Sequence, residues 1–454
     1  MTESINPTTG KPNKSYSSHT KIEIDDKVDQ TYNAWDSWRQ TSFAERSVMM
    51  RNAGRALRNR KDELANLMAI EMGKPLKGGV AEIEKCADAC SFYADNAKRF
   101  LRDEPVKTDA GKSYISYQPL GVILAVMPWN FPFWQVFRFL APCLMAGNCG
   151  ILKHASNVPG CALAIEDIIK KAGFPPFVFQ TLLIDSKSVN AVIENSKISA
   201  VTLTGSVEAG KKIAEKAGSV LKKTVLELGG SDAYIVLEDA DLDLAAETCV
   251  NSRLINSGQS CIAAKRFIVM EKVGKKFIEL FKDKMSAKVV GDPLNDKTDV
   301  GPLARLDLRD ELHKQVEGSI QKGAICILGG KIEPGTHAFY PPTILTNVKK
   351  GMPAYDEELF GPVASIILAM NENEAINIAN DTVFGLGAAI FSRDIVKAEE
   401  IAAKRLQAGS CFVNSLVKSD PRLPFGGIKN SGYGRELAAF GIREFVNIKT
   451  VYVK

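Results

Sequence analysis

From Gly121 onwards, short runs of apolar and β-branched residues alternate with longer stretches of helical character. Strands that are apolar at every position are buried on both faces, and strands that alternate with helices are typical of a parallel sheet covered on both sides. The expected strands are 122–127, 150–153, 201–204, 224–227 and 233–237, and the expected helices are 135–145, 163–171 and 208–217. The alternation therefore predicts an α/β fold.

A second series of the same kind begins after Asp239. We expect helices at 242–254, 274–285 and 308–322, and strands at 267–270, 324–328 and 363–369. The chain has 454 residues, about three times the length of a typical domain, so more than one core is expected. Two α/β domains are predicted to meet near residue 230.

The two ends of the chain carry simpler patterns. Ser42 and Glu45 form a capping box, and helical spacing continues from there to Gly73, where a helix should end. A second helical stretch reaches about Leu101. Residues 445–454 alternate as a single strand that must pair with something, for example with another subunit.

Composition and charge exclude several classes of protein. The net charge is +5 and the 58 basic residues are not gathered into a run, which argues against nucleic acid as the main partner. No apolar run approaches the roughly 18 residues of a membrane helix, and residues 1–18 do not resemble a secretory signal, so we expect a cytoplasmic protein. The nine cysteines and four histidines lack metal-site or C-x-x-C spacing, so no metal is expected.

Cys261 is the best candidate for a nucleophile. A free cysteine is usually an inert core residue, and the other eight lie in helical or strand runs among apolar neighbours. Cys261 instead follows the polar turn N-S-G-Q-S at 256–260, which can leave its sulfur exposed.

Glu227 ends an expected strand and precedes two glycines. The carboxyl edge of a parallel sheet is where open α/β folds bind ligands, and partial burial there would raise the pKa of the carboxyl and suit it to act as a general base. The alternative is a salt-bridged residue at the end of a strand.

Two turns that follow strands have the character of binding sites. Asn130 in W-N-F-P can present an amide donor to a developing oxyanion, which contributes roughly 3 kcal/mol in other enzymes, although such a turn alone is more often structural. The segment 204–210 leads from a strand into a helix, so its free backbone N–H groups can bind an anion. The G-x-G-x-x-G fingerprint is absent.

Taken together, these motifs resemble the NAD(P)-dependent aldehyde dehydrogenase superfamily, from I-N-P-T-T-G at residues 5–10 to the last strand. The matching segments are W-N-F-P at 129–132, K-H-A-S at 153–156, T-G-S at 204–206, E-L-G-G at 227–230, G-Q-S-C at 258–261, E-L-F-G-P-V at 358–363 and P-F-G-G-I-K-N-S-G-Y-G-R-E at 424–436. The resemblance implies a cofactor domain (1–100 and 121–229), a catalytic domain (230–430) and a β-flap (101–120 and 440–454) that forms a homodimer or homotetramer.

The resemblance also implies catalytic roles. Cys261 would attack an aldehyde, and the side chain of Asn130 with the backbone N–H of Cys261 would hold the oxyanion of the thiohemiacetal. Transfer of hydride to the cofactor would leave a thioester. Glu227 would activate the water that hydrolyses it, so the product would be a free acid.

The cofactor residues follow in the same way, and the cofactor would be NADP or NAD. Ribose hydroxyls would be held by Lys153 and Glu358, the site would be shaped by Trp129 and Phe360, and the pyrophosphate would face Gly205 and Ser206. Many NAD-preferring relatives carry glutamate where this chain has Ser156. Because a neutral hydroxyl does not repel a 2′-phosphate, we expect NADP to be accepted well.

Arg138 suggests a substrate with a distal carboxylate. Arginine offers a two-pronged donor to carboxylates, and succinate-semialdehyde dehydrogenases have arginine at the matching position. The segments L-K-H-A at 152–155, E-L-G-G-S-D at 227–232 and S-D-P-R-L-P at 419–424 look most like the bacterial branch of that group, so the resemblance implies succinate semialdehyde as the substrate. The alternative is that Arg138 pairs with a carboxylate of the protein. A second arginine found in some of these enzymes is Ile255 here, and Arg253, Lys418 or Arg422 could replace it.

Two other functions stay open. One is a dehydrogenase of another small aldehyde, such as an amino or aromatic aldehyde, in which Arg138 is structural. The other is a non-catalytic protein that keeps the fold, which fold alone does not exclude.

Overall fold

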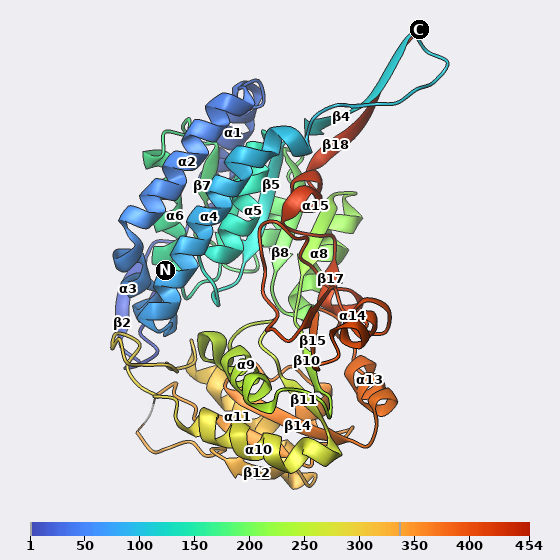
Figure 1. The fold of residues 1–454 in the computed structure, drawn as a ribbon. Coiled ribbons are helices and arrows are strands. Elements are labelled where there is room, and N and C mark those ends of the chain that lie inside the picture. Colours follow the sequence, from blue (N-terminus) through green and yellow to red (C-terminus); the bar gives the residue numbers. More distant parts are fainter. Residues whose placement is uncertain (1, 336) are drawn as a thin grey trace.

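The computed structural model describes residues 2–335 and 337–454 and contains two large sheets, an antiparallel flap and a short N-terminal hairpin (Figure 1). The hairpin pairs β1 (Thr2–Ile5) with β2 (Pro12–Tyr16). The chain completes most of one large sheet before it starts the other, because Glu227 ends the last strand of the first series and Ala233 begins the second. The two series of strands and helices expected from the sequence are confirmed.

The first large sheet has six strands in the order β17-β9-β8-β5-β6-β7, all parallel except β17. Its strands are β5 (Val122–Met127), β6 (Cys149–His154), β7 (Phe179–Thr181), β8 (Ile198–Thr204), β9 (Lys223–Glu227) and β17 (Gly432–Tyr433). The helices of this part are α1 (Lys21–Trp38), α2 (Phe43–Asn59), α3 (Lys61–Met72), α4 (Leu76–Phe100), α5 (Trp134–Met145), α6 (Pro159–Lys171), α7 (Val189–Glu194) and α8 (Val207–Ser219). Strand β17 comes from the far end of the chain, so the C-terminal segment returns to this sheet.

The helix expected from residue 42 to Gly73 is divided in two. The capping box of Ser42 and Glu45 is present, with both reciprocal hydrogen bonds, and Gly73 ends α3 with a φ of +77°. Between them Arg60 leaves the helical conformation, so α2 ends at Asn59 and α3 begins at Lys61.

The second large sheet has seven strands in the order β12-β13-β14-β11-β10-β15-β16, with β12 antiparallel at one edge. Its strands are β10 (Ala233–Val236), β11 (Arg266–Met270), β12 (Ile325–Leu328), β13 (Thr343–Thr346), β14 (Val363–Ala369), β15 (Gly387–Phe391) and β16 (Ser410–Val413). Its helices are α9 (Leu242–Leu254), α10 (Glu271–Ser286), α11 (Leu306–Gln321), α12 (Pro353–Asp356), α13 (Glu372–Asn380) and α14 (Ile395–Lys404). Alternate residues of β10 enter two separate hydrophobic cores, which explains why this strand is apolar at every position.

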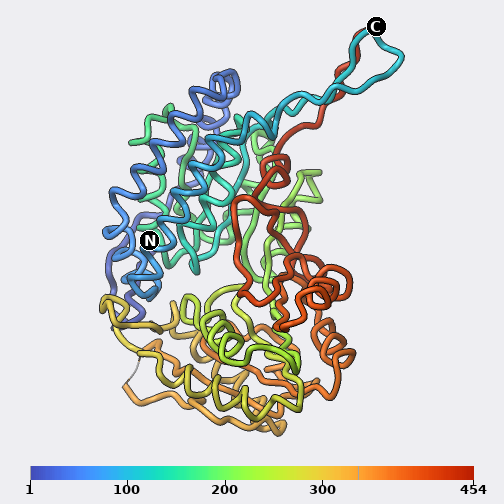
Figure 2. Tube along the Cα trace, in the orientation of Figure 1, coloured from blue at the N-terminus to red at the C-terminus, as the bar shows by residue number. Residues whose placement is uncertain are grey.

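The last strand, β18 (Val446–Val453), pairs antiparallel with β4 (Lys112–Pro119) of the same chain, and β3 (Glu104–Pro105) pairs with the other side of β4. This flap projects from the body and carries the C-terminus near its tip (Figure 2). A short helix, α15 (Ala438–Arg443), leads into β18. The expected pairing partner of the tail is therefore found within the subunit.

Candidate active site

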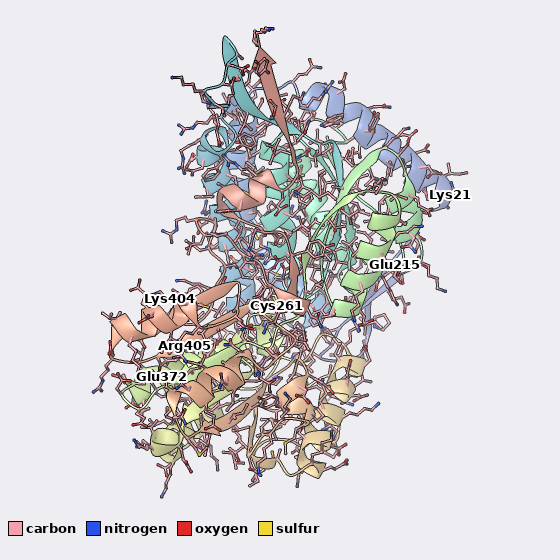
Figure 3. The ribbon with its side chains drawn as sticks, turned by 90° about the vertical axis from the view of Figure 1, so that its right-hand side faces the viewer. Lys21, Glu215, Cys261, Glu372, Lys404 and Arg405 are labelled. Carbon is pink, nitrogen blue, oxygen red and sulfur yellow. The ribbon has the colours of Figure 1, made fainter. Side chains whose placement is uncertain are left out.

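A cavity of about 520 Å³ lies where the carboxyl ends of the strands of the first sheet face the second sheet. Cys261 is on its wall, between the two halves of the molecule (Figure 3). Six other residues singled out from the sequence share this wall, namely Trp129, Asn130, Gly205, Ser206, Glu358 and Phe360. Lys153, Ser156, Glu227 and Arg138 are not on it. The structure thus gathers seven of the eleven predicted site residues around one cavity.

Cys261 follows a strained turn. Asn256, Ser257 and Gly258 all have positive φ values, of 53°, 56° and 77°. A Cβ on Gly258 would lie 2.2 Å from the backbone O of Gly361, so only glycine fits at this position. Strained backbone conformations of this kind are common at functional sites, where they hold a side chain in a fixed orientation.

The thiol of Cys261 is half-buried, and burial raises its pKa to about 12. The positive charges of Arg138 and Lys265 act in the opposite direction. At neutral pH the thiol is therefore protonated in this structure and must lose its proton to become a nucleophile. Exposure alone would not identify it, because Cys326 and Cys411 are also half-buried, but neither lies on the cavity wall.

Asn130 follows β5 and is held by two hydrogen bonds. Its Nδ2 donates to the backbone O of Gln259 at 3.2 Å, and its Oδ1 accepts from the backbone N of Phe131 at 3.1 Å. The Asn256 side chain in turn donates to the backbone O of Asn130 at 2.7 Å. These bonds join the W-N-F-P turn to the turn that carries Cys261, and they leave the second N–H of the Asn130 amide available.

Glu227 ends β9, as expected, but its carboxyl is buried away from the cavity wall. Burial raises the pKa of Glu227 well above its usual value; Arg138 lowers it and Glu436 raises it. Its Oε1 has no hydrogen-bond partner among the described residues. A buried carboxyl with one unpartnered oxygen and a raised pKa is suited to accept a proton, and no ion pair of Glu227 is found among the described residues.

Arg138 on α5 adopts the alternative weighed for it from the sequence. Its guanidinium is buried and forms an ion pair with Glu436, and its Nη2 donates to Thr204 Oγ1 at 3.3 Å. Of the possible substitutes, Arg253 is buried and donates to the backbone O of Gly258, and Arg422 pairs with Asp420. Glu436 faces Arg138 from a distant part of the chain, and the role of Arg138 toward a substrate carboxylate stays a prediction.

Trp129, Lys153, Ser156, Gly205 and Ser206 follow or end strands of the first sheet, whereas Glu358 and Phe360 precede β14 of the second sheet. Ser206 caps α8, and its Oγ accepts from the backbone N of Ala209 at 3.3 Å, so the positive end of the helix faces the cavity. The rings of Trp129 and Phe360 pack edge to face, with their centroids 5.8 Å apart. At the end of β6, Lys153 is half-buried, which lowers its pKa, while Ser156 in the following turn is exposed.

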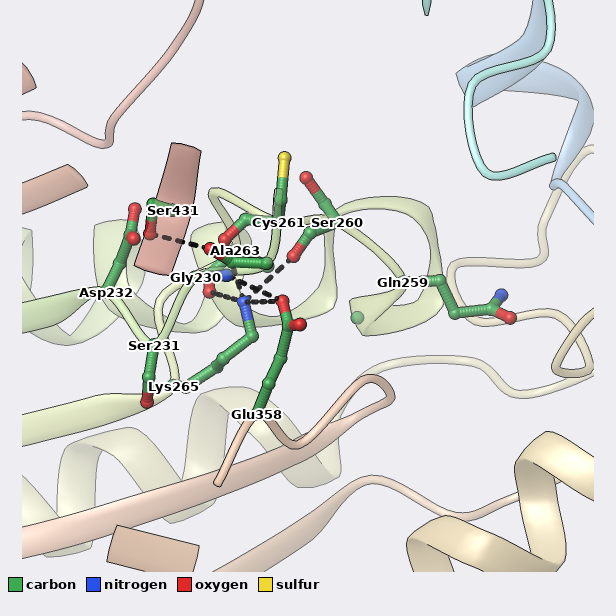
Figure 4. Close-up of polar contacts among 12 residues, drawn as sticks. Gly230, Ser231, Asp232, Gln259, Ser260, Cys261, Ala263, Lys265, Glu358 and Ser431 are labelled. Atoms are coloured by element: carbon green, nitrogen blue, oxygen red, sulfur yellow. Dashed lines mark hydrogen bonds and ion pairs between the residues drawn. The ribbon is translucent and has the colours of Figure 1, made fainter. Parts of the chain in front are cut away.

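Lys265 is a site residue that sequence reasoning did not single out. Its Nζ donates to the backbone O of Ser260, Cys261 and Ala263, at 3.0, 2.9 and 3.1 Å, and pairs with Glu358 Oε1 at 3.5 Å (Figure 4). Glu358 Oε1 also accepts from the backbone N of Gly230 at 3.0 Å. The sequence feature that could have identified Lys265 is its position, directly before the apolar strand β11 and four residues after Cys261.

The observed groups can bind a dinucleotide. Anion-binding backbone N–H groups, an aromatic pair and the Glu358 carboxylate surround a cavity of suitable size, and a Cβ on Gly229 would collide with Glu358 Oε2 at 2.3 Å. Within the described residues, no cluster of three or more metal-ligating side chains is present. No helix in the described part of the chain combines the length and hydrophobicity that crossing a membrane requires.

Comparison with known proteins places these observations in a family. Residues 1–451 match the sequence profile of the Aldehyde dehydrogenase family. The chain is 51% identical over 451 residues to a probable succinate-semialdehyde dehydrogenase [NADP(+)] of Synechocystis sp., with 99% of each chain covered. It is 49% identical over 452 residues to succinate-semialdehyde dehydrogenase [NADP(+)] 1 of Mycobacterium tuberculosis, again with 99% of each covered. The crystal structure of succinic semialdehyde dehydrogenase from Streptococcus pyogenes in complex with NADP+ superposes with a TM-score of 0.97 at 38% identity, covering all of both chains.

Proposed function

The chain belongs to the aldehyde dehydrogenase family, and we propose that it oxidises succinate semialdehyde to succinate with NADP+ as the preferred oxidant. The observation that carries the proposal is the shared cavity, in which a half-buried cysteine and an amide donor face predicted dinucleotide-binding groups. The names of the relatives that are about half identical over the whole chain support the choice of aldehyde and of oxidant.

In the acylation half of the reaction, Cys261 Sγ forms a bond to the aldehyde carbon after its proton has left. The carbonyl oxygen becomes an oxyanion, which accepts hydrogen bonds from the free N–H of the Asn130 amide and from the backbone N–H of Cys261 in this proposal. NADP+, when bound, accepts the hydride that leaves the former aldehyde carbon. The carbon is thereby oxidised and stays on the sulfur as a thioester.

In the second half, Glu227 takes a proton from the water that attacks the thioester, and the thiol leaves as the acid is released. A raised pKa makes this carboxylate a better proton acceptor than an exposed glutamate. Because the carboxyl lies away from the cavity wall, its side chain has to rotate toward Cys261 to reach that water. The overall reaction consumes the aldehyde, NADP+ and water and yields the acid, NADPH and protons.

Residues at the ends of β6 and β8 and before β14 bind the dinucleotide in this proposal. The N-terminus of α8, at Gly205 and Ser206, binds the pyrophosphate, and Lys153 and Glu358 bind ribose hydroxyls. Ser156 is exposed and uncharged, so it leaves room for a 2′-phosphate without repelling it.

Arg138 keeps a proposed part in holding the distal carboxylate of the substrate. A guanidinium carries five N–H donors, more than its contacts with Glu436 and Thr204 use. An Arg138→Ala variant that loses kcat/KM equally for succinate semialdehyde and butanal would remove this role.

We also propose the larger organisation implied by the family. Residues 1–100 and 121–229 form the cofactor domain and 230–430 the catalytic domain. The flap of 101–120 and 440–454 joins subunits into a homodimer or homotetramer, and it exposes Ile448, Tyr452 and Val453 for that purpose. All nine cysteines are free thiols, which suits the reducing cytoplasm.

The test is the near-ultraviolet absorbance of reduced coenzyme, recorded with purified protein, NADP+ or NAD+, and a panel of aldehydes. We expect the highest kcat/KM with succinate semialdehyde and NADP+. Preference for an amino or aromatic aldehyde would overturn the substrate, and no reduction with any aldehyde would overturn the enzyme assignment.

A further inference from the structure

A second cavity, of about 440 Å³, borders the W-N-F-P turn that also borders the Cys261 cavity. Asn130 lines the first cavity, whereas the next residue, Phe131, lines the second together with Trp134. Asn256, on the wall of the second cavity, donates its side-chain hydrogen bond to the backbone O of Asn130. The second cavity is large enough for a small organic molecule and adjoins the reaction site.

Lys85 on α4 contributes a cation to the wall of this cavity. Its Nζ donates to Ser419 Oγ at 2.7 Å and lies 4.1 Å from the centre of the Trp134 ring. No carboxylate pairs with it among the residues that the structure describes. The half-buried ammonium group is held in this position by a hydroxyl and an aromatic face.

Each acidic group near Lys85 is already bound to another cation. Glu82 pairs with Lys74 and also accepts the backbone N–H groups at the start of α5. Asp420 pairs with Arg422. The positive charge of Lys85 is therefore left for an anion that comes from outside the protein.

The other lysines of this cavity differ from Lys85. Lys74 and Lys77 are neutralised by Glu82 and Asp299. Lys288 donates to Asn251 at 3.0 Å and also borders a separate surface depression, so it lies toward the outer rim. Lys74 also lies over an aromatic ring, that of Phe131 at 3.7 Å, but among the described lysines of this cavity Lys85 is the one that lies against an aromatic ring without a carboxylate partner.

We propose that Lys85 binds the distal carboxylate of the substrate and so selects ω-carboxy aldehydes. This inference rests on the proposed function and deepens it, because it adds an unpaired cation to the carboxylate contact proposed for Arg138, whose charge Glu436 partly offsets. The methylene groups of the substrate would lie against Phe131 and Trp134, and Ser419 would hold the ammonium group in position.

The ionisation of Lys85 gives the proposal a pH signature. Burial lowers its pKa to about 8, and the charge of Arg138 on α5 adds to this effect. Cys86 and Glu82 on its own helix and Asp420 in the loop that carries Ser419 act in the opposite direction. Because the neutral amine does not attract a carboxylate, the KM for succinate semialdehyde should rise as the pH passes about 8.

The experiment compares kcat/KM for succinate semialdehyde and for butanal, which has the same chain length but no carboxylate. We expect Lys85→Met to lower the ratio of the two values by about 10- to 100-fold, the range for one lost hydrogen bond between charged groups. Lys85→Arg should keep most of the ratio and shift the rise in KM to higher pH. Lys85→Gln, which retains a donor to Ser419, gives the same comparison if the methionine variant fails to fold.

Lys77→Met is the matched control, because Lys77 lines the same cavity but is neutralised by Asp299. An unchanged ratio in Lys85→Met and Lys85→Gln, in an enzyme that prefers succinate semialdehyde, would overturn the role of Lys85 alone. A wild-type enzyme without that preference would overturn the proposed substrate and this inference together.

Discussion

Replacing Lys265 with methionine removes the ammonium group beneath the nucleophile turn while keeping a side chain of similar length. Three backbone carbonyls, those of Ser260, Cys261 and Ala263, would each lose a hydrogen bond of 2.9 to 3.1 Å. Hydrogen bonds to charged groups contribute at least about 1.5 kcal/mol each. The variant no longer has to bury an ammonium group, and this gain offsets part of the loss. We therefore expect the free energy of unfolding to fall by about 3 kcal/mol.

The reactivity of Cys261 should change as well. Lys265 lowers the pKa of the thiol, so its removal leaves a smaller thiolate fraction at a given pH. We expect iodoacetamide to alkylate Cys261 about tenfold more slowly near pH 8, which corresponds to about one pKa unit. Alkylation is followed by mass spectrometry of the peptide that contains Cys261, and stability by urea unfolding.

Lys272→Met is the control for this experiment, because Lys272 forms only an exposed ion pair with Glu238, at 3.0 Å. Exposed pairs of this kind contribute about 0 to 1 kcal/mol. If Lys265→Met matched the control in both unfolding and alkylation, the reasoning about the buried network would be refuted.

Three further predictions concern the base, the cofactor and the turn. Glu227→Gln should give a burst of NADPH equal to the enzyme concentration, followed by steady-state turnover about 10²- to 10⁴-fold slower than that of the wild type. Wild-type turnover should rise with pH as Glu227 ionises. A variant that shows no burst would contradict the role of Glu227 in hydrolysis. Ser156→Glu should lower the NADP+ to NAD+ ratio of kcat/KM by roughly 5- to 100-fold through charge repulsion, and an unchanged ratio would remove Ser156 from the 2′-phosphate site. Gly258→Ala should lose activity and about 1 to 3 kcal/mol of stability, because its Cβ would lie 2.2 Å from the backbone O of Gly361. Kinetics and an unfolding free energy equal to those of the wild type would show that the turn is not strained in this way.

The sequence predicted those elements that depend on local pattern. Strands β5 and β14 and helix α9 have the expected bounds, because continuous apolar runs and helical spacing mark them clearly. Strand β15, G-A-A-I-F, was not expected, since small residues with weak strand preference give little signal. The break at Arg60 was missed because neither glycine nor proline marks it.

The sequence allowed most residues of the candidate site to be predicted, but not the contacts that these residues make. Cys261 and Asn130 were found from local motifs and Glu358 from the family resemblance, and all three lie on one cavity wall. Burial of Glu227 and pairing of Arg138 with a protein carboxylate were both considered from the sequence, but the partner Glu436 and the position of the Glu227 carboxyl off the cavity wall were not predictable. They depend on where the C-terminal segment packs after it returns to the first sheet at β17.

The most direct test of the account is the rate of NADPH formation by Cys261→Ala with succinate semialdehyde and NADP+. Thermal unfolding and NADP+ binding serve as controls, because the substitution removes only the sulfur of a half-buried side chain. We predict that the variant folds and binds NADP+ but forms no NADPH above the rate without enzyme. NADPH formation at the wild-type rate would contradict the assignment of Cys261 as the nucleophile.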